Sequence, residues 1–177
     1  AEEREALGLS GSMGHTPNTD PAASLLGEKQ WQWLERQLQV PAELRLICSG
    51  TQVINDTKGM QEWGNFPLER ERLFRLIETT GAQGVILLSG NVHYSELSVT
   101  RDTPYPLYDF TASGMTHTNP AYAKYFNPYR VAGPYSEHHF SVVEIRWGES
   151  GSKLNLKTIG LDGQVVFEYT VAMSELK

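Results

Sequence analysis

The residues best placed to do chemistry are Gly90, Asn91 and His93, which follow the most apolar short run of the sequence, residues 85–88. Such a run is typical of a strand that is covered on both faces. In α/β proteins, ligands bind beyond the carboxyl ends of strands, where loops gather over the sheet. Gly90 allows a sharp turn there, and His93 then places an imidazole at the strand end, where it could bind a metal or a proton. A histidine that merely caps a turn would suit the same position.

Other polar residues could serve this site, and each has an ordinary alternative. Glu96 stands three residues after His93 and could orient its ring as a hydrogen-bond acceptor, although an ion pair within a strand would explain it as well. His117 could line the mouth of the site or be an exposed loop histidine. The adjacent His138 and His139 precede a strand and are expected to be solvated.

Ser89 and Ser113 raise the alternative of a serine hydrolase. The sequence has no Gly-x-Ser-x-Gly elbow, and neither serine has an evident base, so it gives this class little support. Trp63 and Arg70 could contact phosphate, but helix packing and a surface ion pair would explain them equally.

The overall composition argues against several other functions. A formal net charge of −6 does not suit a generic nucleic-acid binder. No apolar run approaches the roughly 20 residues that a membrane-spanning helix needs. The single cysteine, Cys48, cannot form an internal disulfide, and its apolar neighbours predict a buried core thiol. The polar N-terminus shows neither a signal peptide nor an initiator Met, as expected of a processed chain or a fragment.

The spacing of apolar residues predicts the elements that position these groups. One helix is expected around Trp31 to Leu38, ended by Pro41, and a second after Pro67, ended at Gly81. Asp162-Gly163 predicts a hairpin, whereas residues 113–137 are expected to form a loop. This order predicts an α/β (α+β layered) domain. Runs typical of strands, the first of them buried, lie at residues 44–49, 85–88, 96–100, 107–111, 140–147, 153–159 and 164–171.

Four segments also carry a resemblance to a known family. They are residues 26–34 (LGEKQWQWL), 63–70 (WGNFPLER), 88–94 (LSGNVHY) and 105–114 (YPLYDFTASG). In this order, and from Leu25 onward, the chain resembles the second half of the alkaline phosphatase D family, in the calcineurin-like metallophosphoesterase superfamily. The resemblance implies the C-terminal half of a metallophosphoesterase two-sheet β-sandwich flanked by helices. Residues 1–24 would then be an irregular arm continuing from an upstream part, and residues 25–177 the C-terminal half of the domain.

The same resemblance implies metal-dependent hydrolysis of phosphate monoesters or diesters, with iron and calcium, or other divalent metals, as cofactors. His93 and Asn91 would both be catalytic residues and metal ligands, with His93 holding the first metal and Asn91 helping to hold a second. The family usually has aspartate where this chain has Asn91, whose carbonyl oxygen brings no charge. A further late histidine would be expected near residues 49–52, where Thr51 or Gln52 offers only oxygen, which suits a hard cation such as calcium.

The carboxylate-bearing motifs of the family's first half have no counterpart in residues 1–24. We therefore expect these 177 residues alone to be inactive and to need the upstream half of the same domain as a partner, alongside a phosphate-ester substrate. The resemblance suggests a periplasmic or secreted protein. The main alternative is a catalytically inactive binding or scaffold module of the same fold, favoured by asparagine at position 91.

Overall fold

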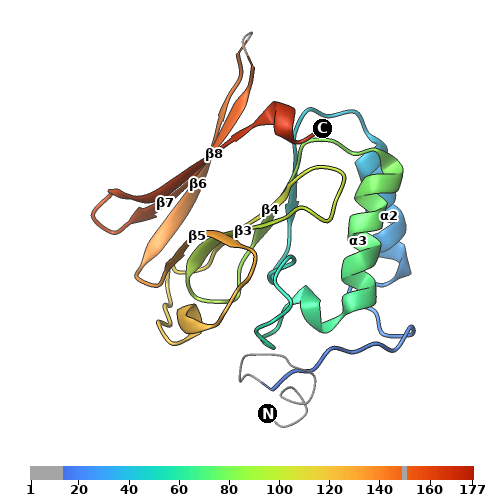
Figure 1. The fold of residues 1–177 in the computed structure, drawn as a ribbon, viewed down its shortest axis with the longest axis horizontal. Helices are drawn as coiled ribbons and strands as arrows, with labels where there is room; N and C mark the ends of the chain where they lie inside the picture. The colour runs from blue at the N-terminus through green and yellow to red at the C-terminus, as the bar shows by residue number, and fades with distance from the viewer. Residues whose placement is uncertain (1–13, 149–150) are drawn as a thin grey trace.

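The structure is a computed structural model that describes residues 14–148 and 151–177. Its layers are plain in Figure 1, where the helices α2 and α3 lie on one side of a five-stranded sheet and a three-stranded sheet lies on the other. The helices are α2 (Glu28–Gln39) and α3 (Pro67–Thr80), with short 3-10 turns η1 (Trp63–Asn65), η2 (Tyr122–Lys124) and η3 (Met173–Glu175). The larger sheet contains β1 (Arg45–Cys48), β2 (Val85–Ser89), β3 (Ser95–Thr100), β4 (Leu107–Ala112) and β5 (Arg130–Tyr135). The smaller sheet contains β6 (His139–Arg146), β7 (Lys153–Gly160) and β8 (Val165–Ala172).

The two helices form where the apolar spacing predicts them. Trp31, Leu34 and Leu38 are the buried residues of α2, which ends just before Pro41 because proline cannot continue the backbone ladder. In α3, Pro67 occupies the first turn, and Gly81 ends the helix in the left-handed region with φ of 63°. The inward faces of both helices belong to one core that extends to both sheets.

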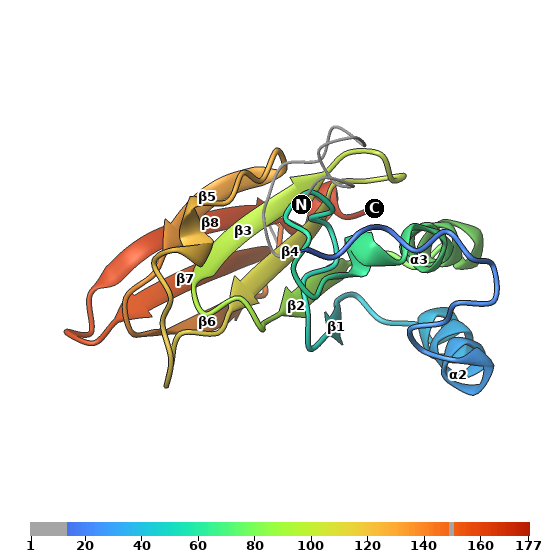
Figure 2. The same cartoon turned by 90° about the horizontal axis from the view of Figure 1, so that it is seen from below.

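The strand order of the larger sheet, β1-β2-β4-β3-β5, decides where the loops meet. β1, β2 and β4 are parallel neighbours, so their carboxyl ends lie at the same sheet edge. β3 runs antiparallel between β4 and β5. The view in Figure 2 shows this sheet from another side, with β1 nearest the helices. The three segments that follow β1, β2 and β4 therefore converge at one end of the sheet, as α/β architecture predicts.

Three of the sequence-based expectations about strands need correction. β5 lies within residues 113–137, which were expected to form only a loop. The segment contains Gly133 and Pro134, which are tolerated because β5 is an edge strand. β1 is also an edge strand, and its residues alternate between half-buried and exposed rather than being buried throughout. Cys48 is consequently exposed and not a core thiol.

The smaller sheet follows the prediction closely. β7 and β8 pair antiparallel across Asp162 and Gly163, where Gly163 has φ of 77°. Leu154, Leu156 and Val171 of this sheet are fully buried and join the main core. In the described residues 14–24 there are turns but no helix or strand, and the prediction for residues 1–13 lies outside the described part of the chain. None of the helices described is long and apolar enough to span a membrane.

Candidate functional site

The turn after β2 has an unusual backbone. Asn91 and His93 have φ of 75° and 60°. In the described part of the chain, they are the residues other than glycine with a positive φ. Asparagine visits this left-handed region readily, but histidine does so less often, because its Cβ approaches the backbone. A strained conformation persists only where the surroundings enforce it, and such strain is frequent at functional sites.

The surroundings of His93 show what enforces this turn. Its backbone N–H donates to the Ser113 hydroxyl at 2.8 Å, and its carbonyl accepts from the Asn119 N–H at 3.2 Å. The half-buried His93 ring lies close to the rings of His117 and Tyr122, with centroid distances of 6.0 and 5.9 Å. The loops after β2 and β4 thus meet at this imidazole, four residues beyond the end of a buried strand, where the sequence predicts it.

Asn91 is the second residue predicted to hold a metal, and it lies in the same turn. Its side-chain N–H donates to the Gln61 carbonyl at 3.3 Å, which ties the turn to the loop that follows β1. The carbonyl oxygen of an amide held in this way can still act as a ligand to a hard cation. Asn91 is half-buried, so such a cation would be near solvent.

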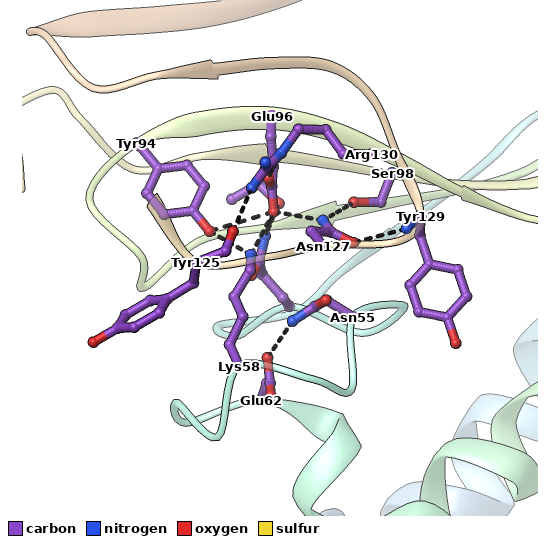
Figure 3. A network of polar contacts seen from close by, with 12 residues as sticks. Asn55, Lys58, Glu62, Tyr94, Glu96, Ser98, Tyr125, Asn127, Tyr129 and Arg130 are labelled. Carbon is purple, nitrogen blue, oxygen red and sulfur yellow. Dashed lines mark hydrogen bonds and ion pairs between the residues drawn. The ribbon is translucent and has the colours of Figure 1, made fainter. Parts of the chain in front are cut away.

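Just beyond His93 lies a group of paired polar side chains, here called the buried ionic network, in which Lys58 and Glu96 are the central charges (Figure 3). Both side chains are fully buried, and Lys58 Nζ lies 2.6 Å from Glu96 Oε1. Arg130 Nε donates to the other oxygen of Glu96 at 2.5 Å. The remaining partners are Gln52, Tyr94 and Asn127.

The network joins four segments that are far apart in the sequence. Lys58 comes from the loop after β1, Glu96 from β3, Arg130 from β5, and Asn127 from the segment before β5. The pKa of Glu96 lies below its usual value: burial acts to raise it, but the charges of Lys58 and Arg130 outweigh the burial. The Glu96 carboxylate is therefore held in its charged form, and the loops are joined around it.

A second buried carboxylate, Asp109 of β4, fastens the loop after β1. It accepts hydrogen bonds from the N–H groups of Val53 and Ile54 at 2.7 and 3.1 Å, and from the Ser89 hydroxyl at 2.6 Å. Burial raises the pKa of Asp109, although these donors oppose the shift. Its role is structural, because its oxygens are occupied by backbone and hydroxyl donors.

Several candidates from the sequence prove to be structural. Glu96 is the partner of Lys58 and Arg130, so the ion-pair alternative describes it better than orientation of the His93 ring. The sequence suggested Gln52 as an oxygen ligand for a hard cation. Its amide is instead hydrogen-bonded to Lys58, Glu96 and Thr111 and is not free to bind one.

Trp63, Arg70 and Ser89 are equally engaged within the fold. The indole N–H of Trp63 donates to Ser49, and the guanidinium of Arg70 donates to the carbonyls of residues 53 and 54 and pairs with Asp56 at 3.3 Å. Ser89 Oγ bonds to Asp109 and Thr111. No hydrogen bond from Ser89 or Ser113 to a histidine ring is found in the described residues, so the geometry gives no support to a serine hydrolase.

His139 was expected to be solvated, but it is only 3% exposed. Its ring lies against Gly114, where an added Cβ would come within 2.1 Å of the imidazole. His139 begins β6 and is buried, whereas His138 lies in the bend before this strand and is exposed. The burial of Lys58 and of His139 has no local signal in the sequence, because Lys58 pairs with Glu96 of β3 and the His139 ring packs against Gly114 of another loop.

A metal centre needs several ligands, and this turn supplies only some of them. No group of three or more His, Cys, Asp or Glu side chains with metal-binding geometry occurs within residues 14–148 and 151–177. His93 suits a transition metal through its imidazole, and Asn91 suits a harder cation through its oxygen. Within the described residues, this turn therefore offers one imidazole and one amide oxygen and no complete metal centre.

The sequence matches a known protein family. The family model described as "PhoD-like phosphatase" matches residues 4–138, which is more than half of the chain. The chain belongs to the PhoD-like phosphatase family. This confirms the resemblance based on the four sequence segments. The match ends before β6, so the three-stranded sheet lies outside the matched range.

Solved structures agree with this assignment at the level of the fold. A structure described as "Structure of PhoD" superposes with a TM-score of 0.60 and 19% sequence identity, covering 89% of this chain. The superposition covers 34% of that chain, so the present chain spans about a third of it. No curated protein matches the sequence significantly. The two-sheet α+β fold predicted from the sequence is thus confirmed.

Proposed function

We propose that this chain supplies the late metal-ligand motif of a metal-dependent phosphoesterase that hydrolyses phosphate monoesters or diesters. The observation that carries this proposal is the position of His93. It lies at the carboxyl edge of the larger sheet, in a strained turn that loops from two neighbouring strands enforce. Membership of the PhoD-like phosphatase family gives the reaction class.

In this proposal His93 holds the first metal and Asn91 helps to hold the second. Bound metals would lower the pKa of water and offset negative charge on the phosphoryl oxygens. The chain's own contribution is to fix the donors: Ser113 orients the backbone of His93, and Gln61 accepts from the Asn91 amide. The buried ionic network holds the chain immediately after the turn, because Tyr94 and Glu96 both belong to it.

For metal identity we propose iron at the imidazole and calcium at the oxygen donor. Imidazole nitrogen suits iron and related transition metals, whereas amide oxygen suits calcium. Asn91 provides no negative charge, so neutral ligands alone would hold a hard divalent cation weakly. The carboxylates needed for tight binding would come from elsewhere in the protein.

We further propose that an upstream half of the same domain supplies these carboxylates. Support comes from the coverage of about a third of the PhoD chain and from β1, which is an edge strand. Beside β1 and α2 lies a groove of about 680 Å³. Trp33 and Leu46 line it and are 51% and 42% exposed. An unpaired strand edge next to apolar side chains is a suitable surface for an added strand. A periplasmic or secreted location belongs to the same proposal.

A second candidate is a catalytically inactive binding or scaffold module of this fold. It is favoured by Asn91, which stands where the family usually has a charged ligand. This module would bind phosphate esters or metals without turnover. The two candidates differ in whether the complete protein hydrolyses its ligand.

The test is a phosphatase assay with a chromogenic phosphate ester, iron and calcium. It compares the 177-residue chain alone with the chain mixed with, or joined to, the preceding region of the protein. We expect turnover only when both parts are present, and we expect His93→Ala to abolish it and to lower the iron content. Robust turnover by the chain alone would contradict the proposal that it holds only part of the metal centre. Metal binding without turnover by the joined protein would favour the inactive module.

A further inference from the structure

The ring of His117 lies close to the ring of His93. The two residues come from different loops, after β4 and after β2, and their ring centroids are 6.0 Å apart with planes inclined at 38°. His93 is half-buried and His117 is exposed, so a cation from solvent can reach both. From the sequence, His117 could equally be an exposed loop histidine, but in the structure its ring lies beside that of His93.

The separation of these two rings suits a shared cation. A metal lies about 2.0–2.1 Å from an imidazole nitrogen, hence about 3 Å from the ring centre, so two imidazoles on one metal have centres about 5–6 Å apart. The observed 6.0 Å is within reach of this arrangement with a small side-chain adjustment.

The His117 ring is oriented by a neighbouring hydroxyl, as the rings of ligand histidines usually are. The His117 Nδ1 is hydrogen-bonded to the Thr116 hydroxyl at 3.0 Å, which leaves Nε2 available to a cation. The backbone of His93 is held by Ser113 and Asn119, and Ser113 belongs to the same loop as His117. One loop thus positions both imidazoles.

An aromatic wall also lies against the His93 ring. Tyr122 packs on the His93 ring and stacks on Tyr125 at 6.4 Å, and both tyrosines lie against the small apolar cluster of Met60, Val92 and Tyr94. This wall restricts the movement of the His93 ring.

We propose that His93 and His117 together form a two-imidazole site for a borderline transition-metal ion such as Fe²⁺ or Zn²⁺. Nitrogen donors favour these ions over calcium. The inference deepens the proposed function and rests on its placement of a cation at His93. It adds a ligand from the loop after β4, which makes that loop part of the metal centre.

The test is a titration of the 177-residue chain with Zn²⁺, followed by NMR of the imidazole ¹⁵N signals. A Cys48→Ser background removes the exposed thiol as a competing ligand. We expect the signals of His93 and His117 to change together with one half-saturation concentration. Either His93→Ala or His117→Ala should raise that concentration at least tenfold, whereas the exposed control His138→Ala should leave it unchanged.

Two results would overturn the two-imidazole site: His117→Ala that binds Zn²⁺ as tightly as the parent, or a change of the His93 signals alone. The phosphatase assay separates this inference from the proposed function. Turnover by the joined protein, with zinc binding indifferent to His117, would overturn only the two-imidazole site. Zinc binding by both histidines, together with no turnover by the joined protein, would support the two-imidazole site and contradict the proposed hydrolase function.

Discussion

The buried ionic network and the His93 turn are built from the same loops, yet they follow opposite designs. In the network, Lys58 and Glu96 are fully buried and each charge has an opposite charge within 2.6 Å. In the turn, His93 and Asn91 are half-buried, and their backbone occupies the left-handed region. One region is fully paired and hidden, and the other is strained and open to ligands.

The difference shows how the fold can maintain a strained site. Strain of this kind costs about 1–3 kcal/mol per residue and survives only where the rest of the structure fixes it. The network does this locally, because Tyr94 and Glu96 directly follow the turn and are tied to Lys58. The paired charges that stabilise the fold therefore lie directly beside the strained turn.

The largest effect we expect comes from breaking the network. Glu96→Ala leaves Lys58 buried without its anion and removes the partner of Arg130, so the free energy of unfolding should fall by about 3–5 kcal/mol. Urea denaturation at neutral pH measures this loss. A buried Lys58 that found another partner or lost its proton would reduce it.

A matched control is Glu144→Ala on the smaller sheet. Glu144 also pairs with a lysine and an arginine, Lys157 and Arg146, but at the protein surface. Water replaces its partners after mutation, so the loss should be far smaller. Similar losses for Glu96→Ala and Glu144→Ala would mean that burial does not distinguish the two clusters.

A smaller effect of the opposite sign is expected at the turn. His93→Gly removes the Cβ that makes a φ of 60° unfavourable, whereas His93→Ala retains it. We therefore expect the glycine variant to be more stable than the alanine variant by about 1 kcal/mol, while both lose metal binding. Thermal denaturation of the two variants gives the difference. Equal stability would show that the backbone at position 93 is relaxed.

The sequence was sufficient for most of the fold because the elements have strong local patterns. The face formed by Trp31, Leu34 and Leu38 predicts α2, and Asp162-Gly163 predicts the β7–β8 hairpin. The edge strand β5 was not predicted because Gly133 and Pro134 are turn formers. They are tolerated in a strand here because β5 lies at the sheet edge.

Burial was harder to predict than element type. The apolar run that ends at Cys48 suggested a covered strand, but β1 has a neighbour on one side only and exposes alternate residues. Lys58 lies in a polar loop, and nothing near it in the sequence indicates that it is fully buried. Its partner Glu96 is 38 residues away, so only the tertiary structure brings the charges together.

The position of the candidate site could be predicted from the sequence, but not all of the residues around His93 could. The apolar strand β2 followed by Gly90 indicated where His93 would lie, because strand ends collect ligand sites. The neighbours of its ring, His117 and Tyr122, come from a segment without a regular pattern. Their segment is joined to the turn by the Asn119 N–H, which donates to the His93 carbonyl and which no sequence pattern indicates.

The smallest effect we expect concerns His139, which combines features of both regions because it is buried like the network but only half satisfied. Its Nδ1–H donates to the Glu137 carbonyl at 2.8 Å, while its Nε2 is buried and has no hydrogen-bond partner in the described residues. Burial lowers the pKa of His139, although the bond to Glu137 opposes the shift.

The unfolded chain therefore binds a proton on His139 more readily than the folded chain does, so stability should rise with pH through the unfolded pKa of about 6.5 and fall below it. Between pH 8 and pH 6 this single group can contribute at most about 0.8 kcal/mol. His139→Phe keeps a ring against Gly114 and removes the titration. Urea denaturation at both pH values should show a larger loss on acidification for the parent than for His139→Phe, with exposed His138→Ala behaving like the parent. The same loss in the parent and in His139→Phe would mean that the buried imidazole is protonated as easily in the folded protein as in the unfolded chain.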